Sequence, residues 1–323
     1  MLQGDLSLPR THLKILPPSE PNSLRLAFNA FLLDREATRR SRLTIRTYDS
    51  CLRDFIAFLE GQGVTTPEAI APSHIRAYLV SLQRQGLKDT TTQNRARVAN
   101  IFCHFLVEEG IIPESPMRKV KMPRVDRRVL PAFSPEDVKR LLAACLSACR
   151  RPGASDDNPR DTAIVLCLLD TGLRAGEFVA LNVADVDLKT GAVQVRRGKG
   201  GKGRVAFLGA KARKALLKYL LARGEAKPDE PLWLSGRTGE RLTAHGLASV
   251  LRDLGKRADV AHCHPHTFRR TFALWSLRAG MNVYALQQIM GHSDLSVLRR
   301  YLALVEQDLA EAHRKHGAVD NML

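Results

Sequence analysis

The sequence predicts a mainly α-helical protein of two domains, with a small β-hairpin in the second domain. Three observations indicate this fold class. Apolar residues recur at helical spacing through most of the 323 residues. A segment rich in prolines and cations lies between two such groups of helices, and the chain is long enough for a domain on each side of it. Two short alternating runs flank a Gly/Lys-rich turn at residues 198–202, which is typical of a hairpin.

The first domain is predicted at residues 22–112, after a loose tail at residues 1–21 that contains four prolines. Apolar side chains repeat every three or four positions in four stretches, and a glycine follows each of the last three. Helices are therefore expected near residues 24–32, 45–59, 75–82 and 98–106. Four such helices form a small all-α bundle.

A basic linker is predicted at residues 113–132. Its four prolines interrupt helix and strand alike, and it holds six lysines and arginines. We interpret it as a strap that lies along a DNA phosphate backbone, and a solvated connector is the alternative. The residues predicted to contact DNA, in the linker and outside it, are Arg95, Arg97, Arg118, Lys119, Lys121, Arg124 and Lys202.

The second domain is predicted at residues 133–323. The sequence SPED at residues 134–137 combines a capping serine, a first-turn proline and two acids, which is typical of a helix N-terminus. A buried helix around TAIVLCLLDTG is expected to end at Gly172, and the hairpin follows within residues 191–209. Further helices are expected at residues 243–257, 266–279, 283–290 and 296–304.

The composition favours a polyanionic partner. Fifty lysines and arginines against 33 acids give a net charge of +17 and a pI near 10.1. Nucleic acid is the usual partner of a protein with so large a positive charge. The alternative is a protein that is merely basic and binds no nucleic acid. No apolar run approaches the ~18 residues of a membrane span, and the N-terminus lacks the apolar core of a signal peptide. The six cysteines have no framework spacing, so free thiols and a cytoplasmic location are predicted.

The stretch HCHPHTFRR at residues 262–270 permits two interpretations, a metal site or a phosphate site. A metal is disfavoured because the leading histidines and cysteine are too close in sequence to converge on one ion, and a neighbouring guanidinium repels cations. No metal site is therefore predicted. His266 and Arg269 share one helix face after Pro265, near a helix N-terminus where backbone N–H groups favour anions. The alternative is a capping histidine beside a surface arginine.

Two further segments carry cations suited to a phosphate site. TGLRAGE at residues 171–177 places Arg174 at the start of a helix, where Glu177 is expected to hold it. The alternative is a purely structural salt bridge. The hairpin turn contains Lys199, which is a candidate proton donor, and Lys202, for which a contact to the DNA backbone is favoured.

The segment GHSDLSVLRRYLAL supplies a candidate nucleophile. It places His292 at a turn after a helix and Tyr301 nine residues later. A phenol with a pKa of ~10 is a poor nucleophile alone, and it becomes more reactive beside arginines and a histidine. An ordinary core aromatic residue is the alternative for Tyr301.

These motifs, taken in order, resemble those of the tyrosine recombinase (phage integrase) family, close to its Xer-type members. The resemblance covers about residues 22–315 and implies a SAM-like helical core-binding domain and a catalytic domain that close on duplex DNA as a C-shaped clamp. Members often have histidine where Arg270 stands. The catalytic residues that the resemblance implies are Arg174, Lys199, His266, Arg269, His292 and Tyr301.

The resemblance also implies a role for each of these residues. Tyr301 attacks a scissile DNA phosphate and forms a 3′-phosphotyrosine, while Lys199 protonates the leaving 5′-oxygen. A 5′-hydroxyl of a partner strand then attacks the phosphotyrosine and reseals the DNA. The covalent link retains the phosphodiester energy, so no metal, ATP or other cofactor is required.

For the remaining catalytic residues the resemblance implies binding of the phosphate. Arg174 and Arg269 clamp its non-bridging oxygens, and His266 and His292 donate hydrogen bonds and assist proton transfer.

The implied partners are double-stranded DNA recombination sites. Recombination cuts four strands, so a homotetramer on two sites is expected, with a hetero-tetramer containing a paralogue left open, and the acting protein is expected at the nucleoid. The segment after Tyr301 is expected to bind a neighbouring subunit or to pack within its own. Two other functions stay open: DNA relaxation like that of a type IB topoisomerase, and a DNA-binding regulator without catalysis.

Overall fold

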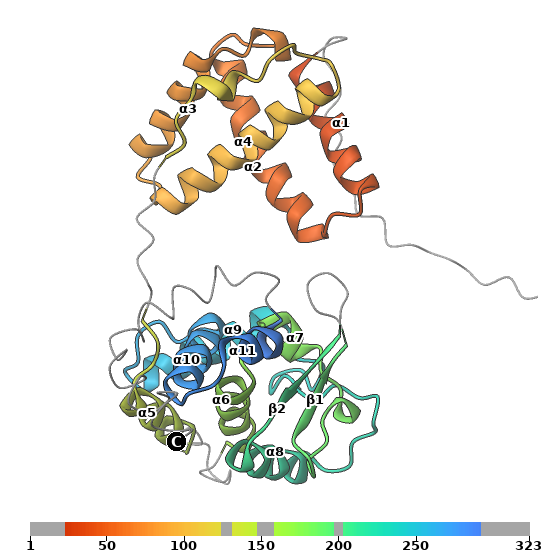
Figure 1. Cartoon of the computed structure of the whole chain (residues 1–323), viewed down its shortest axis with the longest axis vertical. Coiled ribbons are helices and arrows are strands. Elements are labelled where there is room, and N and C mark those ends of the chain that lie inside the picture. Colours follow the sequence, from red (N-terminus) through yellow and green to blue (C-terminus); the bar gives the residue numbers. More distant parts are fainter. Residues whose placement is uncertain (1–22, 124–130, 147–157, 197–202, 292–323) are drawn as a thin grey trace, which may run out of the picture. The chain divides into compact units, whose positions relative to one another are not determined.

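The computed structural model describes residues 23–123, 131–146, 158–196 and 203–291 (Figure 1). The chain divides into two compact units, residues 1–128 and 129–323. The described part is mainly helical with one two-stranded sheet, as the sequence predicts. Among the described residues no helix is long and apolar enough to cross a membrane. The predicted helix at 296–304 lies outside the described residues.

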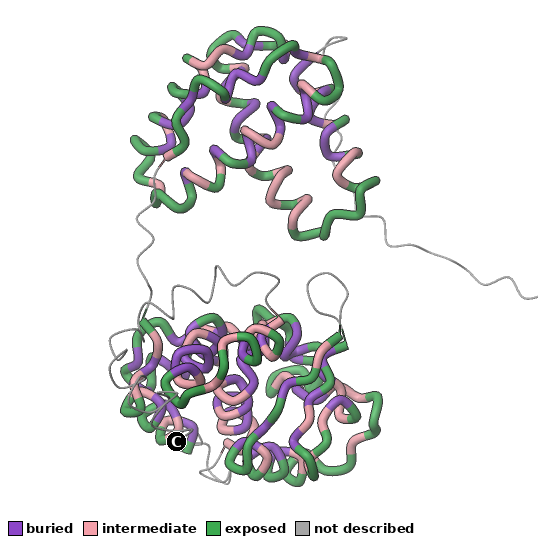
Figure 2. Tube along the Cα trace, in the orientation of Figure 1, coloured by how far each residue is buried: buried purple, intermediate pink, exposed green. Residues whose placement is uncertain are grey.

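Four helices build the first unit, close to the expected stretches. Ser23 and Ser41 cap the first two, each accepting a hydrogen bond from a backbone N–H in the first turn. The elements are α1 (Leu24–Ala37), α2 (Arg42–Gly61), η1 (Pro67–Ala69), α3 (Pro72–Arg84), α4 (Asp89–Glu108) and η2 (Pro116–Lys119). Their apolar faces meet around Phe31, whose ring lies 5.7 Å from that of Phe102 and 5.4 Å from that of Phe105. Burial therefore alternates along each helix (Figure 2).

The first half of the predicted linker packs on the helical unit. Residues 116–119 form the short helix η2, and the apolar side chains of Met117 and Val120 are buried in the core of the unit. Arg76 donates a hydrogen bond to the carbonyl of Lys119 (2.9 Å), and Gln93 donates one to the carbonyl of Pro123 (3.1 Å). The prolines do prevent a long helix here, but two apolar residues three positions apart are enough to anchor a single turn.

In the second unit, α6 lies between other helices, with more than half of its residues buried and none exposed (Figures 1 and 2). It packs against α8 and α10, and α5 and strand β2 also contact it. The elements are α5 (Pro135–Leu146), α6 (Pro159–Thr171), α7 (Ala175–Val179), η3 (Val183–Asp185), β1 (Ala192–Val195), β2 (Arg204–Phe207), α8 (Ala210–Arg223), α9 (Ala244–Arg257), α10 (Pro265–Arg278) and α11 (Val283–Met290). The two strands pair antiparallel, from Ala192 opposite Phe207 to Val195 opposite Arg204.

The core of the second unit contains a stack of aromatic rings. Trp233 is fully buried, and its ring stacks on Phe178 (centroids 4.6 Å apart) and on Tyr219 (5.5 Å). Phe178 belongs to α7 and Tyr219 to α8, so the stack ties the short helix α7 to the rest of the unit. The cysteines that the structure describes are free thiols.

Candidate active site

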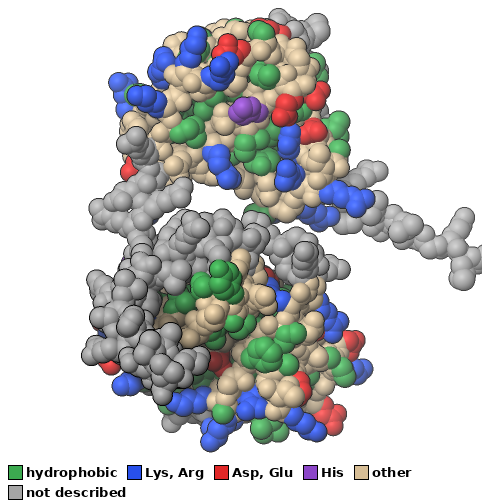
Figure 3. Space-filling view, in the orientation of Figure 1, with side chains coloured by type: hydrophobic (Ala, Val, Ile, Leu, Met, Phe, Trp, Pro, Cys, Tyr) green, Lys and Arg blue, Asp and Glu red, His purple; other side chains and the backbone are tan. Residues whose placement is uncertain are grey.

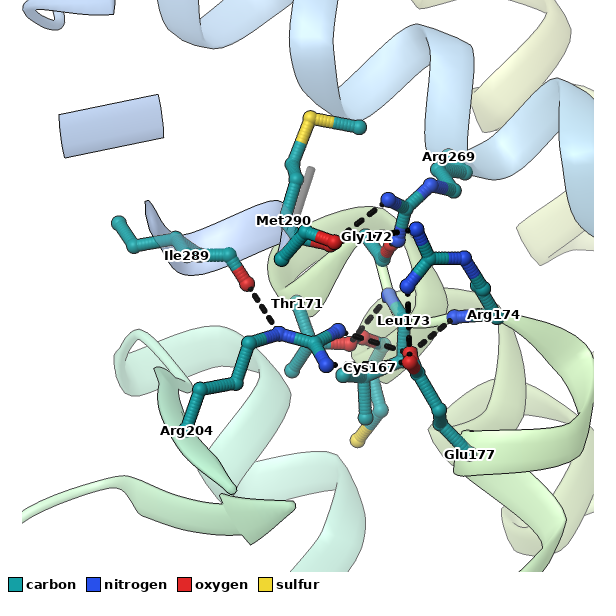
Figure 4. Close-up of polar contacts among 11 residues, drawn as sticks. Cys167, Thr171, Gly172, Leu173, Arg174, Glu177, Arg204, Arg269, Ile289 and Met290 are labelled. Atoms are coloured by element: carbon teal, nitrogen blue, oxygen red, sulfur yellow. Dashed lines mark hydrogen bonds and ion pairs between the residues drawn. The ribbon is translucent and has the colours of Figure 1, made fainter. Parts of the chain in front are cut away.

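The last turn of α11 is held by three arginines from other elements. Nε of Arg204 donates to the carbonyl of Ile289 (2.7 Å), Nη2 of Arg269 to that of Met290 (2.7 Å) and Nη2 of Arg174 to that of Gly291 (3.1 Å). The three guanidinium groups converge on the end of the helix (Figure 4). The final carbonyls of a helix have no partner inside it and carry the negative end of its dipole, so arginines are suitable partners.

Arg174 is positioned by a sharp change of chain direction. Helix α6 ends at Gly172, which adopts a left-handed conformation (φ 57°), and Arg174 is the N-cap of α7. Glu177 accepts hydrogen bonds from the backbone N–H of Arg174 (2.9 Å) and from its Nη1 (2.9 Å). The side chain of Arg174 stays 29% exposed. The predicted Arg174–Glu177 pair is therefore confirmed, and the guanidinium is fixed while part of it faces solvent.

Arg269 connects the ends of two helices. Its side chain is buried, and it donates to the carbonyl of Gly172 (2.6 Å) as well as to that of Met290. Both acceptors are neutral, so these bonds hold the guanidinium without neutralising its charge. A Cβ at Gly172 would lie 2.2 Å from the ring of Phe272, so glycine is needed there for packing as well as for its backbone angle.

His266 lies in the first turn of α10, directly after Pro265, as predicted. Desolvation is the main cause that lowers its pKa, and the positive charges of Arg269, Arg270 and Arg174 lower the pKa further. The imidazole is therefore neutral at pH 7, with one nitrogen able to donate and the other able to accept. The same charges show that His266, Arg269 and Arg174 share one electrostatic environment.

Glu177 is a buried carboxylate between two arginines. Besides Arg174 it binds Arg204, whose Nη1 lies 3.0 Å from Oε1 and whose Nη2 lies 2.7 Å from Oε2. Burial alone would raise the pKa of Glu177, but the hydrogen bonds from Arg204 and Arg174 outweigh burial and lower the pKa to about 2. Arg204 was not predicted from the sequence. No local signal points to it, since hydrophobic alternation along β2 would place Val205 and Phe207 inward and Arg204 outward.

Three predicted catalytic residues lie outside the described residues: Lys199, His292 and Tyr301. Arg174, His266 and Arg269 are brought together, and the other half of the set is not described. Within the described ranges no group of three histidines, cysteines or acids is placed to hold a metal ion.

The predicted DNA-contacting residues fall into three groups. Arg97, Lys119 and Lys121 are exposed, in a unit whose visible face carries many lysines and arginines (Figure 3). Arg118 is exposed and pairs with Glu114 (2.9 Å), while Arg95 is partly buried and pairs with Asp54 (2.8 Å). Two more lie outside the described residues, Arg124 and Lys202.

Two family models match the chain. The model described as "Phage integrase family" matches residues 132–308, and the model described as "Phage integrase, N-terminal SAM-like domain" matches residues 28–110. Among similar proteins, Tyrosine recombinase XerC of Roseiflexus castenholzii is 32% identical over 276 residues, 84% of this chain and 86% of the relative. Tyrosine recombinase XerC of Bacillus pumilus is 31% identical over 284 residues, 85% and 90% of the two chains.

Solved structures share the fold. A lambda integrase dimer bound to a COC′ core site matches with a TM-score of 0.69 and 16% identity, over 86% of this chain and 77% of that one. The XerH site-specific recombinase bound to a palindromic difH substrate, in a post-cleavage complex, matches with a TM-score of 0.68 and 20% identity, over 86% and 81%. The helical unit followed by the unit with the hairpin is therefore an architecture that those proteins share.

Proposed function

The chain belongs to the phage integrase family and is a site-specific tyrosine recombinase, and from this premise we propose which of its residues cut and rejoin DNA. The proposal assigns phosphate binding to Arg174, Arg269 and His266, and the nucleophile to Tyr301. The observation that carries it is the convergence of Arg174 and Arg269 on the end of α11, with the charges of both acting on the imidazole of His266.

Arg174 and Arg269 bind the non-bridging oxygens of the scissile phosphate. A guanidinium carries five N–H donors in a rigid fork that matches a phosphate. Both groups are fixed by backbone carbonyls before DNA arrives, so little reorganisation is needed when charge develops in the transition state. His266, neutral at pH 7, donates a further hydrogen bond to a phosphate oxygen.

Tyr301 supplies the oxygen that forms the new bond to phosphorus. As that bond forms, the phenol passes its proton to His266 or His292, the bond between phosphorus and the 5′-oxygen breaks, and the leaving oxygen takes a proton from Lys199. His292 adds a hydrogen bond to the phosphate. In the second step a 5′-hydroxyl attacks the phosphotyrosine and releases the phenol, so the number of phosphodiester bonds is conserved.

The wider assembly is proposed on the same premise. The domains are assigned to residues 22–112 and 133–323, joined by the basic segment at 113–132, with residues 1–21 as a tail. The family models at 28–110 and 132–308 support this division. Two duplex DNA sites and four subunits, identical or shared with a paralogue, complete the reaction, which takes place at the nucleoid. The lambda integrase dimer and XerH, whose structures share this fold, are bound to DNA sites, which supports duplex DNA as the substrate.

The two alternative functions gain no support from the relatives, which are named as recombinases and integrases. The test is covalent trapping. The protein is mixed with nicked duplex DNA that carries a recombination site and is then denatured. We expect a protein–DNA adduct that the Tyr301→Phe variant does not form. An adduct that persists in this variant contradicts the assignment of the nucleophile.

A further inference from the structure

We propose that Arg204 is a positioning residue for DNA cleavage: it holds Glu177 and the end of α11 in place, and Glu177 in turn sets the position of Arg174. The inference rests on the proposed function, because it assumes that Arg174 binds the scissile phosphate. It adds a residue from strand β2 that acts through its neighbours.

The contacts of Arg204 span three elements. From the first position of β2 its guanidinium binds both oxygens of Glu177 on α7, at 3.0 and 2.7 Å, and its Nε binds the carbonyl of Ile289 on α11, at 2.7 Å. Figure 4 shows the guanidinium between the carboxylate and the helix end. A bidentate pair of this kind is specific in geometry as well as strong. Arg204 therefore fixes the distance between α7 and the end of α11.

The carboxylate of Glu177 is saturated only when Arg204 is present. Its Oε1 accepts from Nη1 of Arg174 and Nη1 of Arg204, and its Oε2 accepts from the backbone N–H of Arg174 and Nη2 of Arg204. A carboxylate has about four acceptor positions, and these four donors use them. Without Arg204, two positions open beside a buried charge whose remaining cation is Arg174. We expect Arg174 to turn toward them and away from the carbonyl of Gly291.

Arg204 is poorly placed to contact DNA itself. Each of the three nitrogens of its guanidinium group already donates a hydrogen bond inside the protein, to Glu177 or to the carbonyl of Ile289, and the side chain is 10% exposed. A Cβ built on Gly291 would lie 3.0 Å from Cδ, Cζ and Nε of Arg204, so the backbone of α11 closes over the side chain. Acting through Glu177 is the role that these contacts allow.

Arg204 also connects the hairpin to the candidate site. It is the first residue of β2 and pairs with Val195, the last residue of β1. The turn sequence between them contains Lys199, the proposed proton donor. One side chain thus links the base of the hairpin, the N-terminus of α7 and the C-terminus of α11.

The test is a double-mutant cycle on single-turnover cleavage of nicked DNA, measured for the wild type, Arg204→Ala, Glu177→Gln and the double variant. We expect Arg204→Ala to slow cleavage about ten- to a hundredfold while the Kd for DNA changes less than about threefold. In the Glu177→Gln background the same substitution should slow cleavage less than about threefold, because the charge that Arg204 balances is gone. Arg204→Lys, which keeps the charge but loses the fork, should fall between the wild type and Arg204→Ala.

Arg223 provides a matched control. It is also buried and pairs with an acid, Glu230 (2.7 Å), and with the carbonyls of Pro231 and Leu232, none of which belongs to the candidate site. Arg223→Ala should lower the Tm as Arg204→Ala does and leave the cleavage rate of the folded protein within about twofold.

Several outcomes overturn the inference. It fails if Arg204→Ala weakens DNA binding as much as it slows cleavage. It also fails if Arg204→Ala slows cleavage equally in the wild type and in Glu177→Gln, or if Arg204→Ala cleaves at the wild-type rate. If Arg204→Ala does not fold, the inference is overturned when folded Arg204→Lys cleaves DNA at the wild-type rate. A wild type that forms no Tyr301 adduct overturns the proposed function as well, which separates that failure from a failure of the inference alone.

Discussion

Two arginines of the first unit and two of the second are held in different ways. In the first unit, Arg25 pairs with Glu60 and Arg118 with Glu114, and all four side chains are substantially exposed. In the second, Arg269 and Arg204 are buried and bind backbone carbonyls and an inward-facing carboxylate. Exposed pairs contribute little to stability and readily exchange their acid for a phosphate, whereas buried groups are oriented before any ligand arrives. The difference separates cations suited to attracting DNA from cations suited to acting on one phosphate.

The largest expected effect tests this comparison in the second unit, at an arginine that is fixed in position and partly exposed. Arg174→Ala should reduce single-turnover cleavage about 100- to 1000-fold, corresponding to ~3–4 kcal/mol, because it removes a donor aimed at developing charge. The Kd for DNA should change little, as measured by fluorescence anisotropy. Arg118→Ala is the surface control and should leave cleavage of bound DNA unchanged. Retained cleavage in Arg174→Ala contradicts the assignment of that residue.

The next effect concerns the buried carboxylate and its dependence on pH. The pKa of Glu177 falls from 4.5 to about 2 on folding, so its contribution to stability is complete above pH 4.5 and is lost as the pH falls toward 2. At pH 7 this contribution is about 3 kcal/mol, of which about 2 kcal/mol is lost by pH 3. Urea unfolding should therefore separate the wild type from Glu177→Gln by more at pH 7 than at pH 3.

Glu60 in the first unit provides a comparison for the pH dependence expected at Glu177. The hydrogen bond from Arg25 is the main cause that lowers its pKa, but the pair is partly exposed. Glu60→Gln should show the same sign of pH dependence with a smaller amplitude, because solvent screens the pair. A gap between the wild type and Glu177→Gln that is equal at both pH values contradicts the assignment of a low pKa.

A smaller effect is expected at two left-handed glycines. Gly172→Ala should destabilise the second unit by about 2–3 kcal/mol, because backbone strain is joined by a clash with the ring of Phe272. Gly110 in the first unit also has a positive φ (67°) but has open space around it. Gly110→Ala should therefore cost only about 1 kcal/mol. Equal changes in thermal unfolding would show that the ring of Phe272 moves aside.

The smallest expected effect is on DNA binding, at two exposed lysines of the first unit. Lys119→Ala and Lys121→Ala should each weaken DNA binding a few-fold and reduce the slope of log Kd against log salt by about one. Cleavage of saturated DNA should not change. An unchanged slope indicates that these lysines do not contact phosphates.

The sequence predicts the helical framework of the site well and its supporting contacts poorly. The end of α6 at Gly172, the start of α10 at Pro265 and the pairing of Arg174 with Glu177 all follow from local rules. Arg269 is predicted to share a site with Arg174, and the structure brings the two guanidinium groups to the same helix end. The acceptors of Arg269 are backbone carbonyls, which no sequence pattern displays.

Strand β2 shows why Arg204 was missed. Alternation of hydrophobicity would place Val205 and Phe207 inward and Arg204 outward. The structure has the reverse, with Val205 and Phe207 exposed and Arg204 inside. A buried ion pair with Glu177 overrides the simple pattern, and its partner is distant in sequence. The short helix η2 is a similar case, since Met117 and Val120 pack into a core that only the folded unit reveals.

The end of α11 also determines how much charge the site presents. Three guanidinium groups meet there, and with the carboxylate of Glu177 these four side chains together carry a net charge of +2. A phosphodiester brings one negative charge, and a pentavalent phosphorus attacked by an ionised phenol bears about two. The net charge of the four side chains therefore matches the charge of the transition state better than the charge of the substrate phosphate. If these groups bind the scissile phosphate as proposed, we expect the site to stabilise the transition state more strongly than the bound DNA.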